Sequence, residues 1–210
     1  SVDPADVRLP EFLPESDRVR QDWAEYLAGI EKVDTKVGRL MEWLKRSGQV
    51  DETIVVYMSD HGPTFQHGKM TLYDLGLRVP LAFSGPGISS GVRAKALASS
   101  VDVLPTLIEL IESYAGTHLK YAGDDPNHLG YAFHGRSLVG HMNPPIRKTI
   151  HDRDYVFAEI SNLGPLPNDG IQERAVFDGR WKLIYRENVE RGWRQVNADS
   201  RQFKTWRNRT

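Results

Sequence analysis

The sequence predicts an α/β domain followed by a small antiparallel β subdomain at the carboxyl end. Two observations lead to this fold class. Near the amino end, a long segment with helical periodicity precedes a short apolar run rich in β-branched residues, which is the order of helix and buried strand that builds α/β sheets. Near the carboxyl end, short aromatic and β-branched runs alternate with turn residues, a pattern typical of an antiparallel meander.

The first predicted element is a long amphipathic helix over residues 18–46. Ser47 and Gly48 end it, because glycine adopts the left-handed conformation that closes a helix without steric cost. Apolar side chains recur in this segment at three- and four-residue steps, which places them on one stripe of the helix. The stripe consists of Trp23, Leu27, Ile30, Val33, Val37, Leu40, Met41 and Leu44.

A strand and a second strand–helix pair follow. The run from Thr53 to Met58 is apolar on both faces, which predicts a central parallel strand that is covered on both sides. Residues 78–85 predict a short strand that begins near Pro80, since proline lacks the N–H that a central ladder needs. Asp102 is the expected N-cap of a helix that ends near Gly116.

The remainder predicts an irregular connection over about residues 117–148 and then three short strands within 155–160, 173–179 and 180–186. We therefore expect two domains, with the α/β part at residues 1–145 and the antiparallel subdomain at residues 146–210. The tail from Arg186 to Thr210 is rich in arginine and tryptophan. It predicts either a surface for a polyanionic sugar or, as the favoured alternative, a solvated face with aromatics packed inward.

Composition limits the possible partners. The 210 residues are 40% hydrophobic and 26% charged, with a formal net charge of −1, so we expect a globular core and no binding of nucleic acid. No apolar stretch approaches the ~20 residues that cross a bilayer, and we expect no membrane anchor. The chain has no cysteine, which removes disulfides, thiolate metal sites and a cysteine nucleophile.

The stretch from Tyr57 to Asp74 carries the candidate chemistry. Asp60 and His61 follow the predicted buried strand, at the place where loops of α/β sheets bind ligands. A carboxylate next to an imidazole suits a divalent cation, and Lys69 has no lone pair, so it would pair with an anion. A tetrahedral ester between a metal and Lys69 satisfies both groups. From the residues alone, a solvated turn that binds no metal is an equal alternative.

Four ordered blocks of the sequence resemble the second half of the sulfatases of the alkaline phosphatase superfamily. They read TIVVYMSDHG, HGKMTLYDLGLRVPLAFSGPG, SSVDVLPTLIEL and HGRSL, within about residues 26–185, and the YDLGLRVPL part is most similar to heparan N-sulfatase-like members. The resemblance implies part of an alkaline-phosphatase-like sheet flanked by helices, followed by a small antiparallel β subdomain. It also implies a hydrolase of sulfuric esters or sulfamates whose substrate is a sulfated carbohydrate or another sulfate ester.

The resemblance assigns roles to four residues. Asp60 matches a carboxylate ligand of calcium, and Lys69 matches the lysine that contacts the sulfate. His61 stands where many sulfatases have asparagine, the next metal ligand, and histidine occurs there in related hydrolases that hold manganese or zinc. His67 precedes the Gly-Lys pair and is the candidate for contact with the leaving group or the substrate, against the alternative of a loop histidine.

The resemblance also implies what this chain does not carry. Sulfatases use a formylglycine made within a Cys/Ser-x-Pro-x-Arg motif, and the nearest approach, Ser84 with Pro86, lacks the arginine. We therefore expect a fragment without the nucleophile, inactive alone, from a periplasmic or secreted parent. Two alternatives remain: a phosphodiesterase or phosphonate monoester hydrolase of the same superfamily, and a remnant that binds glycans without catalysis. The sequence predicts no oligomeric state.

Overall fold

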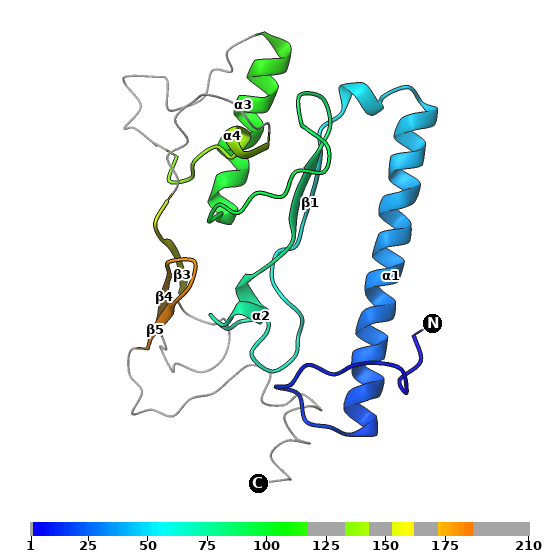
Figure 1. The fold of residues 1–210 in the computed structure, drawn as a ribbon, viewed down its shortest axis with the longest axis vertical. Helices are drawn as coiled ribbons and strands as arrows, with labels where there is room; N and C mark the ends of the chain where they lie inside the picture. Colours follow the sequence, from blue (N-terminus) through cyan, green and yellow to red (C-terminus); the bar gives the residue numbers. More distant parts are fainter. Residues whose placement is uncertain (1, 117–132, 143–152, 162–171, 187–210) are drawn as a thin grey trace. The chain divides into compact units, whose positions relative to one another are not determined.

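The computed structural model describes residues 2–116, 133–142, 153–161 and 172–186 (Figure 1). Helices and strands alternate in the first part of the chain. Strands β3, β4 and β5 are the last elements of the described part. In chain order the elements are α1 (Asp17–Arg46), the 3-10 helix η1 (Val50–Glu52), β1 (Val55–Met58), α2 (Asp74–Leu77), β2 (Leu81–Ser84), the 3-10 helix η2 (Ser100–Asp102), α3 (Val103–Ala115), α4 (Val139–Met142), β3 (Val156–Ile160), β4 (Glu173–Phe177) and β5 (Lys182–Arg186).

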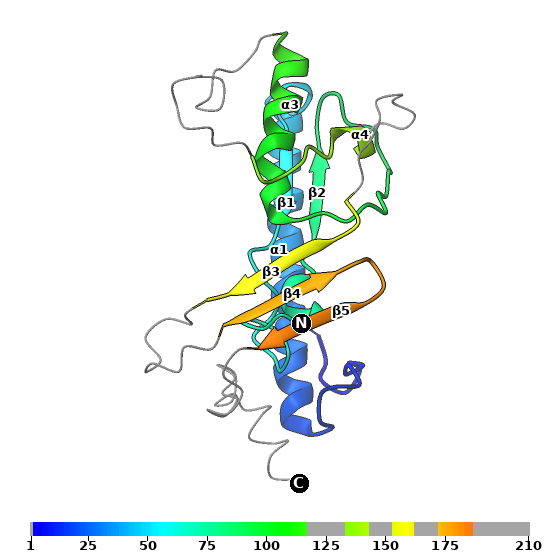
Figure 2. The ribbon, with the colours of Figure 1, turned by 90° about the vertical axis from the view of Figure 1, so that its left-hand side faces the viewer.

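The described strands form two sheets. β1 pairs with β2, and β3, β4 and β5 form a second sheet with β4 in the middle (Figure 2). The turn between β4 and β5 is closed by the Asp178 N–H, which donates to the Trp181 carbonyl at 3.2 Å. Gly179 supplies the positive φ of 93° that the turn requires. The predicted α/β fold with a small antiparallel sheet near the carboxyl end is confirmed.

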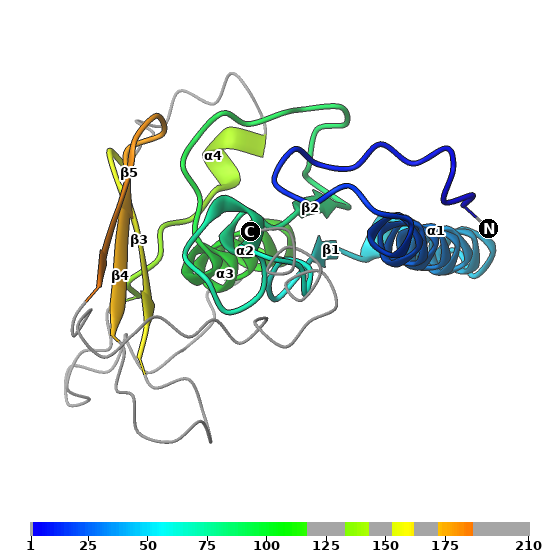
Figure 3. The same cartoon turned by 90° about the horizontal axis from the view of Figure 1, so that it is seen from below.

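Capping hydrogen bonds close both ends of helix α1. The Ser16 hydroxyl accepts a hydrogen bond from the Val19 N–H at 3.2 Å, which satisfies one of the unpaired donors of the first turn. At the other end, the Ser47 N–H donates to the Trp43 carbonyl and Gly48 has a φ of 71°. The predicted helix is thus confirmed to within a residue, and Figure 3 views it nearly along its axis.

A small aromatic cluster ties the loop after β1 to α1. Phe65 is buried and packs edge-on against Trp23, with ring centroids 5.0 Å apart, and against Tyr26 at 5.6 Å. Leu13 and Val19 complete the cluster. Such edge-to-face pairs contribute about 0.5–1.5 kcal/mol beyond the area they bury. The loop that carries the candidate site is therefore held against the first turns of the helix.

Two expectations about burial are wrong for the described residues. The apolar stripe of α1 is exposed in the middle of the helix, with Ile30 45%, Val33 43% and Leu40 48% exposed, whereas Leu44 in the last turn is buried. Strand β1 is also not covered on both faces, since Tyr57 and Met58 at its end are exposed. Among the described strands, β1 pairs with β2 alone, and the described residues leave these two side chains exposed.

Helix α3 begins after Asp102 and ends at Gly116, as predicted, but the Asp102 side chain has a different role from the one expected. Gly116 closes it in the left-handed conformation, with a φ of 64°. Asp102 is fully buried and does not cap α3 with its side chain. Its carboxylate instead accepts hydrogen bonds from the Ser99 N–H at 2.7 Å and from the Arg136 N–H at 2.8 Å. Asp102 therefore joins segments that are distant in sequence, a role that its local pattern does not indicate.

The chain divides into two compact units. One contains the described residues of 1–82, 159–174 and 184–210, and the other contains those of 83–158 and 175–183. The domain boundary that we predicted near residue 145 lies outside the described residues and stays a prediction. No helix in the described part of the chain is both long and apolar enough to span a membrane.

Candidate functional site

The first part of the site is the Asp60–His61 pair that follows β1. The Asp60 Oδ2 and His61 Nε2 atoms lie 3.3 Å apart, and the His61 N–H donates to Asp60 Oδ1 at 2.9 Å. This backbone hydrogen bond is the main reason that the pKa of Asp60 lies below its ordinary value, with smaller contributions from the His61 and Lys69 charges. The carboxylate is therefore ionised at neutral pH and exposed to incoming ligands.

The tautomer of His61 follows from its second contact. The Nδ1 atom lies 2.8 Å from the Gly62 carbonyl oxygen, and because a carbonyl only accepts hydrogen bonds, Nδ1 carries the proton. In the neutral ring the lone pair is then on Nε2, the atom next to Asp60 Oδ2. Two lone pairs in this arrangement repel each other unless a proton or a cation lies between them.

Three glycines fold the following loop tightly onto α2. A Cβ atom on Gly62 would lie 1.6 Å from the Leu75 carbonyl oxygen, one on Gly68 would lie 2.0 Å from the Pro63 carbonyl oxygen, and one on Gly76 would lie 2.5 Å from two carbonyl oxygens. Hydrogen bonds close the same contacts, with the Gly62 N–H donating to the Gly76 carbonyl at 3.0 Å. The lack of a side chain at Gly62 therefore permits this close approach of the two backbone segments.

Lys69 lies on the returning part of this loop. Its N–H donates to the Pro63 carbonyl at 2.8 Å, which folds the chain back toward the Asp60–His61 pair. The ammonium is close enough to Asp60 that its charge contributes to the lowered pKa of that carboxyl. The structure therefore brings Asp60, His61 and Lys69 into one region.

His67 occupies a strained position beside aromatic rings. Its φ is 62°, a conformation that costs a non-glycine residue roughly 1–2 kcal/mol. The Thr71 hydroxyl lies 2.8 Å from the His67 carbonyl and 2.7 Å from the Gly68 carbonyl, so its one proton is shared between them. Burial, and then the charge of Arg186, lower the pKa of His67, so that the ring is neutral at pH 7.

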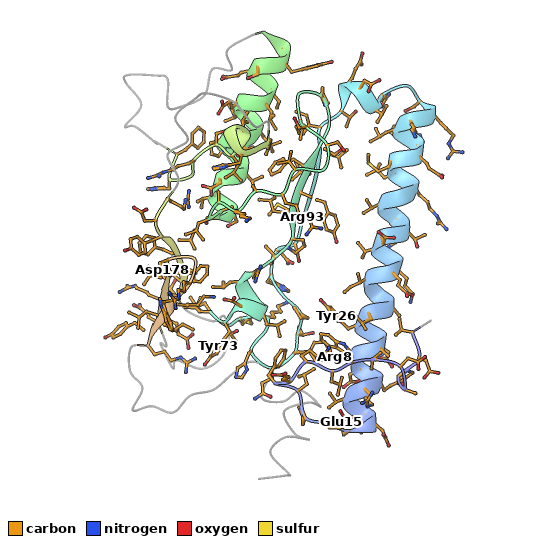
Figure 4. The ribbon with its side chains drawn as sticks, in the orientation of Figure 1. Arg8, Glu15, Tyr26, Tyr73, Arg93 and Asp178 are labelled. Atoms are coloured by element: carbon orange, nitrogen blue, oxygen red, sulfur yellow. The ribbon has the colours of Figure 1, made fainter. Side chains whose placement is uncertain are left out.

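Contacts from the antiparallel sheet to this loop were not predicted. Arg186 on β5 lies over the ring of Tyr73, 6.0 Å from its centroid, and Tyr73 in turn lies 4.6 Å from the His67 ring. Figure 4 labels Tyr73 at the start of α2. The buried Gln66, next to His67, has an Oε1 atom without a hydrogen-bond partner among the residues described. No local pattern marks these residues, because their neighbours come from distant parts of the chain.

In the described ranges, no group of three or more His, Asp or Glu side chains is arranged to hold a metal ion. Asp60 and His61 therefore provide two donors of a site and not a complete ligand shell. Arg78 is exposed and follows the end of α2.

A family model described as Sulfatase matches residues 6–113, about half of the chain. The chain belongs to the sulfatase family. The match includes α1, β1 and the loop with Asp60, His61, His67 and Lys69. The predicted family is thus confirmed on the segment that carries the candidate site.

Several curated sulfatases are similar to this chain. The choline-sulfatase of Rhizobium meliloti is 32% identical over 173 residues, which are 80% of this chain and 30% of that protein. The ulvan-active sulfatase of Formosa agariphila is 28% identical over 88% of this chain and 27% of its own length. The human N-sulphoglucosamine sulphohydrolase is 32% identical over 52% of this chain and 22% of its own length. The chain thus spans less than a third of the length of each relative.

Two solved structures share the sulfatase fold. The phosphonate monoester hydrolase of Agrobacterium radiobacter superposes with a TM-score of 0.63 at 21% identity, over 93% of this chain and 41% of that one. BT4656, solved in complex with its substrate D-glucosamine-2-N,6-O-disulfate, superposes with a TM-score of 0.57 at 19% identity. The superposition covers 86% of this chain and 37% of that one. At these identities the likeness establishes the alkaline-phosphatase-like fold.

Proposed function

We propose that this chain supplies part of the active site of a hydrolase that cleaves a sulfate ester or sulfamate on a sulfated carbohydrate. Asp60 and His61 are proposed to bind a divalent cation, and Lys69 is proposed to bind the sulfate. The observation that carries the proposal is the 3.3 Å separation of Asp60 Oδ2 and His61 Nε2, with Lys69 near enough to influence the same carboxylate.

The donor atoms fit a divalent cation. Metal–oxygen and metal–nitrogen bonds of roughly 2.0–2.6 Å allow one ion to reach two atoms that are 3.3 Å apart. Asp60 is ionised, and the contact of His61 Nδ1 with the Gly62 carbonyl leaves Nε2 as the ring nitrogen that faces Asp60 and can bind the ion. We propose calcium, with manganese or zinc as alternatives, because the Asp60 carboxylate suits calcium and manganese, whereas the His61 imidazole suits zinc.

The sulfatase family generally uses a metal ion together with a formylglycine, and a bound cation would stabilise negative charge on the sulfate oxygens and the nucleophile. The residues of this chain contribute binding and charge. Lys69 donates hydrogen bonds to the sulfate oxygens and offsets the charge that builds up during cleavage. His67, neutral at pH 7, is proposed to hydrogen-bond the leaving oxygen or nitrogen.

The proposed substrate class rests on the similar proteins. One relative is named for ulvan and another for N-sulphoglucosamine, and a neighbour of the same fold was solved with a sulfated glucosamine. These names support a sulfated sugar as the substrate. The phosphonate hydrolase neighbour fits the alternative substrate class, although no residue of the described site favours it.

Metal binding is tested by titrating calcium, manganese and zinc into the 210-residue chain in a calorimeter. Asp60→Asn and His61→Ala should each weaken binding at least tenfold, because each removes one of two donors. Asp51→Asn is the matched control, since it neutralises another exposed acid close to β1. Equal affinity in all variants would refute the assignment.

Hydrolysis is tested on the full-length protein that contains this chain, with aryl sulfate, sulfated sugar and aryl phosphodiester substrates in parallel. We expect the sulfated substrates to be cleaved faster and a chelator to remove the activity. Faster cleavage of the phosphodiester would establish the alternative hydrolase. Binding of a sulfated glycan that a chelator leaves unchanged, without any cleavage, would indicate the non-catalytic remnant.

A further inference from the structure

A chain of contacts leads from the antiparallel sheet to the strained His67. It runs from Glu173 on β4 through Arg186 on β5 and Tyr73 at the start of α2 to the His67 ring. All four residues belong to the same compact unit of the chain.

The first contact anchors the arginine. Counting back from the turn at residues 178–181, Glu173 and Arg186 are opposite each other on adjacent strands, and Arg186 Nε lies 2.7 Å from Glu173 Oε1. Glu173 is buried, where an ionised carboxylate needs a cation beside it. The pair therefore fixes the guanidinium at the edge strand of the sheet.

The second and third contacts reach the loop. Arg186 Nη2 lies 3.5 Å from the Tyr73 hydroxyl, and the guanidinium carbon lies 6.0 Å from the Tyr73 ring centroid, within the range of a cation–π contact. The Tyr73 ring packs against the His67 ring with centroids 4.6 Å apart and a 53° tilt. Phe12 contacts the His67 ring as well, at 6.4 Å.

We propose that Arg186 is a positioning residue, which is anchored by Glu173 and acts through Tyr73 to hold the His67 ring at the sulfate site. This proposal rests on the proposed function for the role of His67, while the contacts themselves do not depend on it. The positive φ of His67 makes such support necessary, because a strained residue keeps its conformation only when its surroundings hold it there.

The arrangement also sets the charge of the ring. Among the described residues, Arg186 from the sheet is the charged group that acts on the His67 ring, and Tyr73 at the start of α2 is the titratable group in contact with it. Burial and the Arg186 cation together lower the pKa of His67. A neutral imidazole at pH 7 can hydrogen-bond a leaving group, whereas a charged ring would compete with Lys69 for the sulfate oxygens.

The test is a histidine titration of the 210-residue chain followed by NMR, with the His67 signal identified by its loss in His67→Gln. Arg186→Gln removes the cation, so the His67 pKa should rise. Arg186→Lys keeps a charge and should leave the pKa lowered. Arg174→Gln is the matched control and should leave the His67 pKa unchanged, because the ion pair that Arg174 on β4 forms with Glu159, at 3.3 Å, is exposed.

A second variant tests the contact independently of the charge. Tyr73→Leu removes the ring between Arg186 and His67, and we expect the His67 ring signals to move and broaden as the ring loses its fixed position. Circular dichroism and thermal unfolding report whether each variant folds. The proposal is overturned if folded Arg186→Gln shifts the His67 titration no more than Arg174→Gln, or if Tyr73→Leu leaves the His67 signals unchanged.

Activity separates this proposal from the proposed function. In the full-length protein, Arg186→Gln should move the acid limb of the pH–rate profile to higher pH, in the same direction as the His67 pKa. If even the wild-type protein cleaves no sulfated substrate while the NMR shifts occur, the proposed function fails and the positioning role of Arg186 stands. If the protein is active and the limb does not move in Arg186→Gln, the positioning role fails.

Discussion

Asp102 and Arg153 form a buried ion pair that joins the start of α3 to the segment before β3. The Asp102 side chain is fully buried and that of Arg153 is 14% exposed. The same carboxylate accepts the Ser99 and Arg136 N–H groups, so both of its oxygens are satisfied. One buried side chain thus connects three segments of the second compact unit.

This ion pair predicts a large loss of stability when one partner is removed. Arg153→Met leaves Asp102 charged and buried without its cation, which should lower the free energy of unfolding by about 3–5 kcal/mol. Arg174→Met, which breaks an exposed ion pair between β4 and β3, should cost no more than about 1 kcal/mol. Urea denaturation of the two variants measures the difference, and equal losses would show that the Asp102 pair does not hold the unit together.

Replacing Gly62 or Gly29 by alanine should have opposite effects, because an added Cβ has no room at Gly62 and open space at Gly29. In Gly62→Ala the new methyl group would lie 1.6 Å from the Leu75 carbonyl oxygen, so the loop must move and metal binding at Asp60 and His61 should weaken. Gly29 in α1 has nothing within 4 Å of an added Cβ, and Gly29→Ala should stabilise the helix by about 0.5–1 kcal/mol. Calorimetric titration and thermal unfolding test both; unchanged metal binding in Gly62→Ala would argue against a loop held by close backbone contact.

Lys69 predicts a specific effect on anion binding. Lys69→Met removes the ammonium that we propose to contact the sulfate, so the affinity of the 210-residue chain for a sulfated monosaccharide should fall at least tenfold, equivalent to roughly 1.4 kcal/mol. Lys36→Met, on the exposed surface of α1, is the control and should leave the affinity unchanged. NMR titration measures both, and an equal fall in the two variants would mean that the sugar is bound by general charge alone.

His67 predicts how stability depends on pH. Its pKa is lowered in the folded chain, so the unfolded chain, with a pKa of about 6.5, takes up the proton first. Stability should therefore fall as the pH drops below about 6.5 and should stop falling from this source once the pH passes below the folded pKa. His67→Gln should remove this part of the pH dependence, which urea denaturation between pH 7.5 and pH 5 measures. A slope that is identical in the two proteins would contradict the lowered pKa.

Only part of the candidate site could be predicted from the sequence. Asp60 and His61 are consecutive residues after a strand, so the proximity of their side chains could be predicted from the sequence. Lys69 returns to them within the same loop, folded by glycines that the sequence also contains. The supporting contact from Arg186 was not predicted, because 113 residues separate it from Tyr73 and no short-range periodicity connects two such positions.

The sequence by itself determined the local structure of this protein: where α1 begins and ends, where α3 ends, which segments form strands, and which family the chain belongs to. These features depend on hydrogen bonds and side-chain periodicity within a few residues, which the chain carries wherever it is placed. The tertiary structure decided which faces are covered, that Asp102 pairs with Arg153 and does not cap α3 with its side chain, and that Arg186 reaches the ring beside His67. Those outcomes depend on packing between segments that are distant in sequence. Such contacts form, and stabilise the protein, only when the chain is folded.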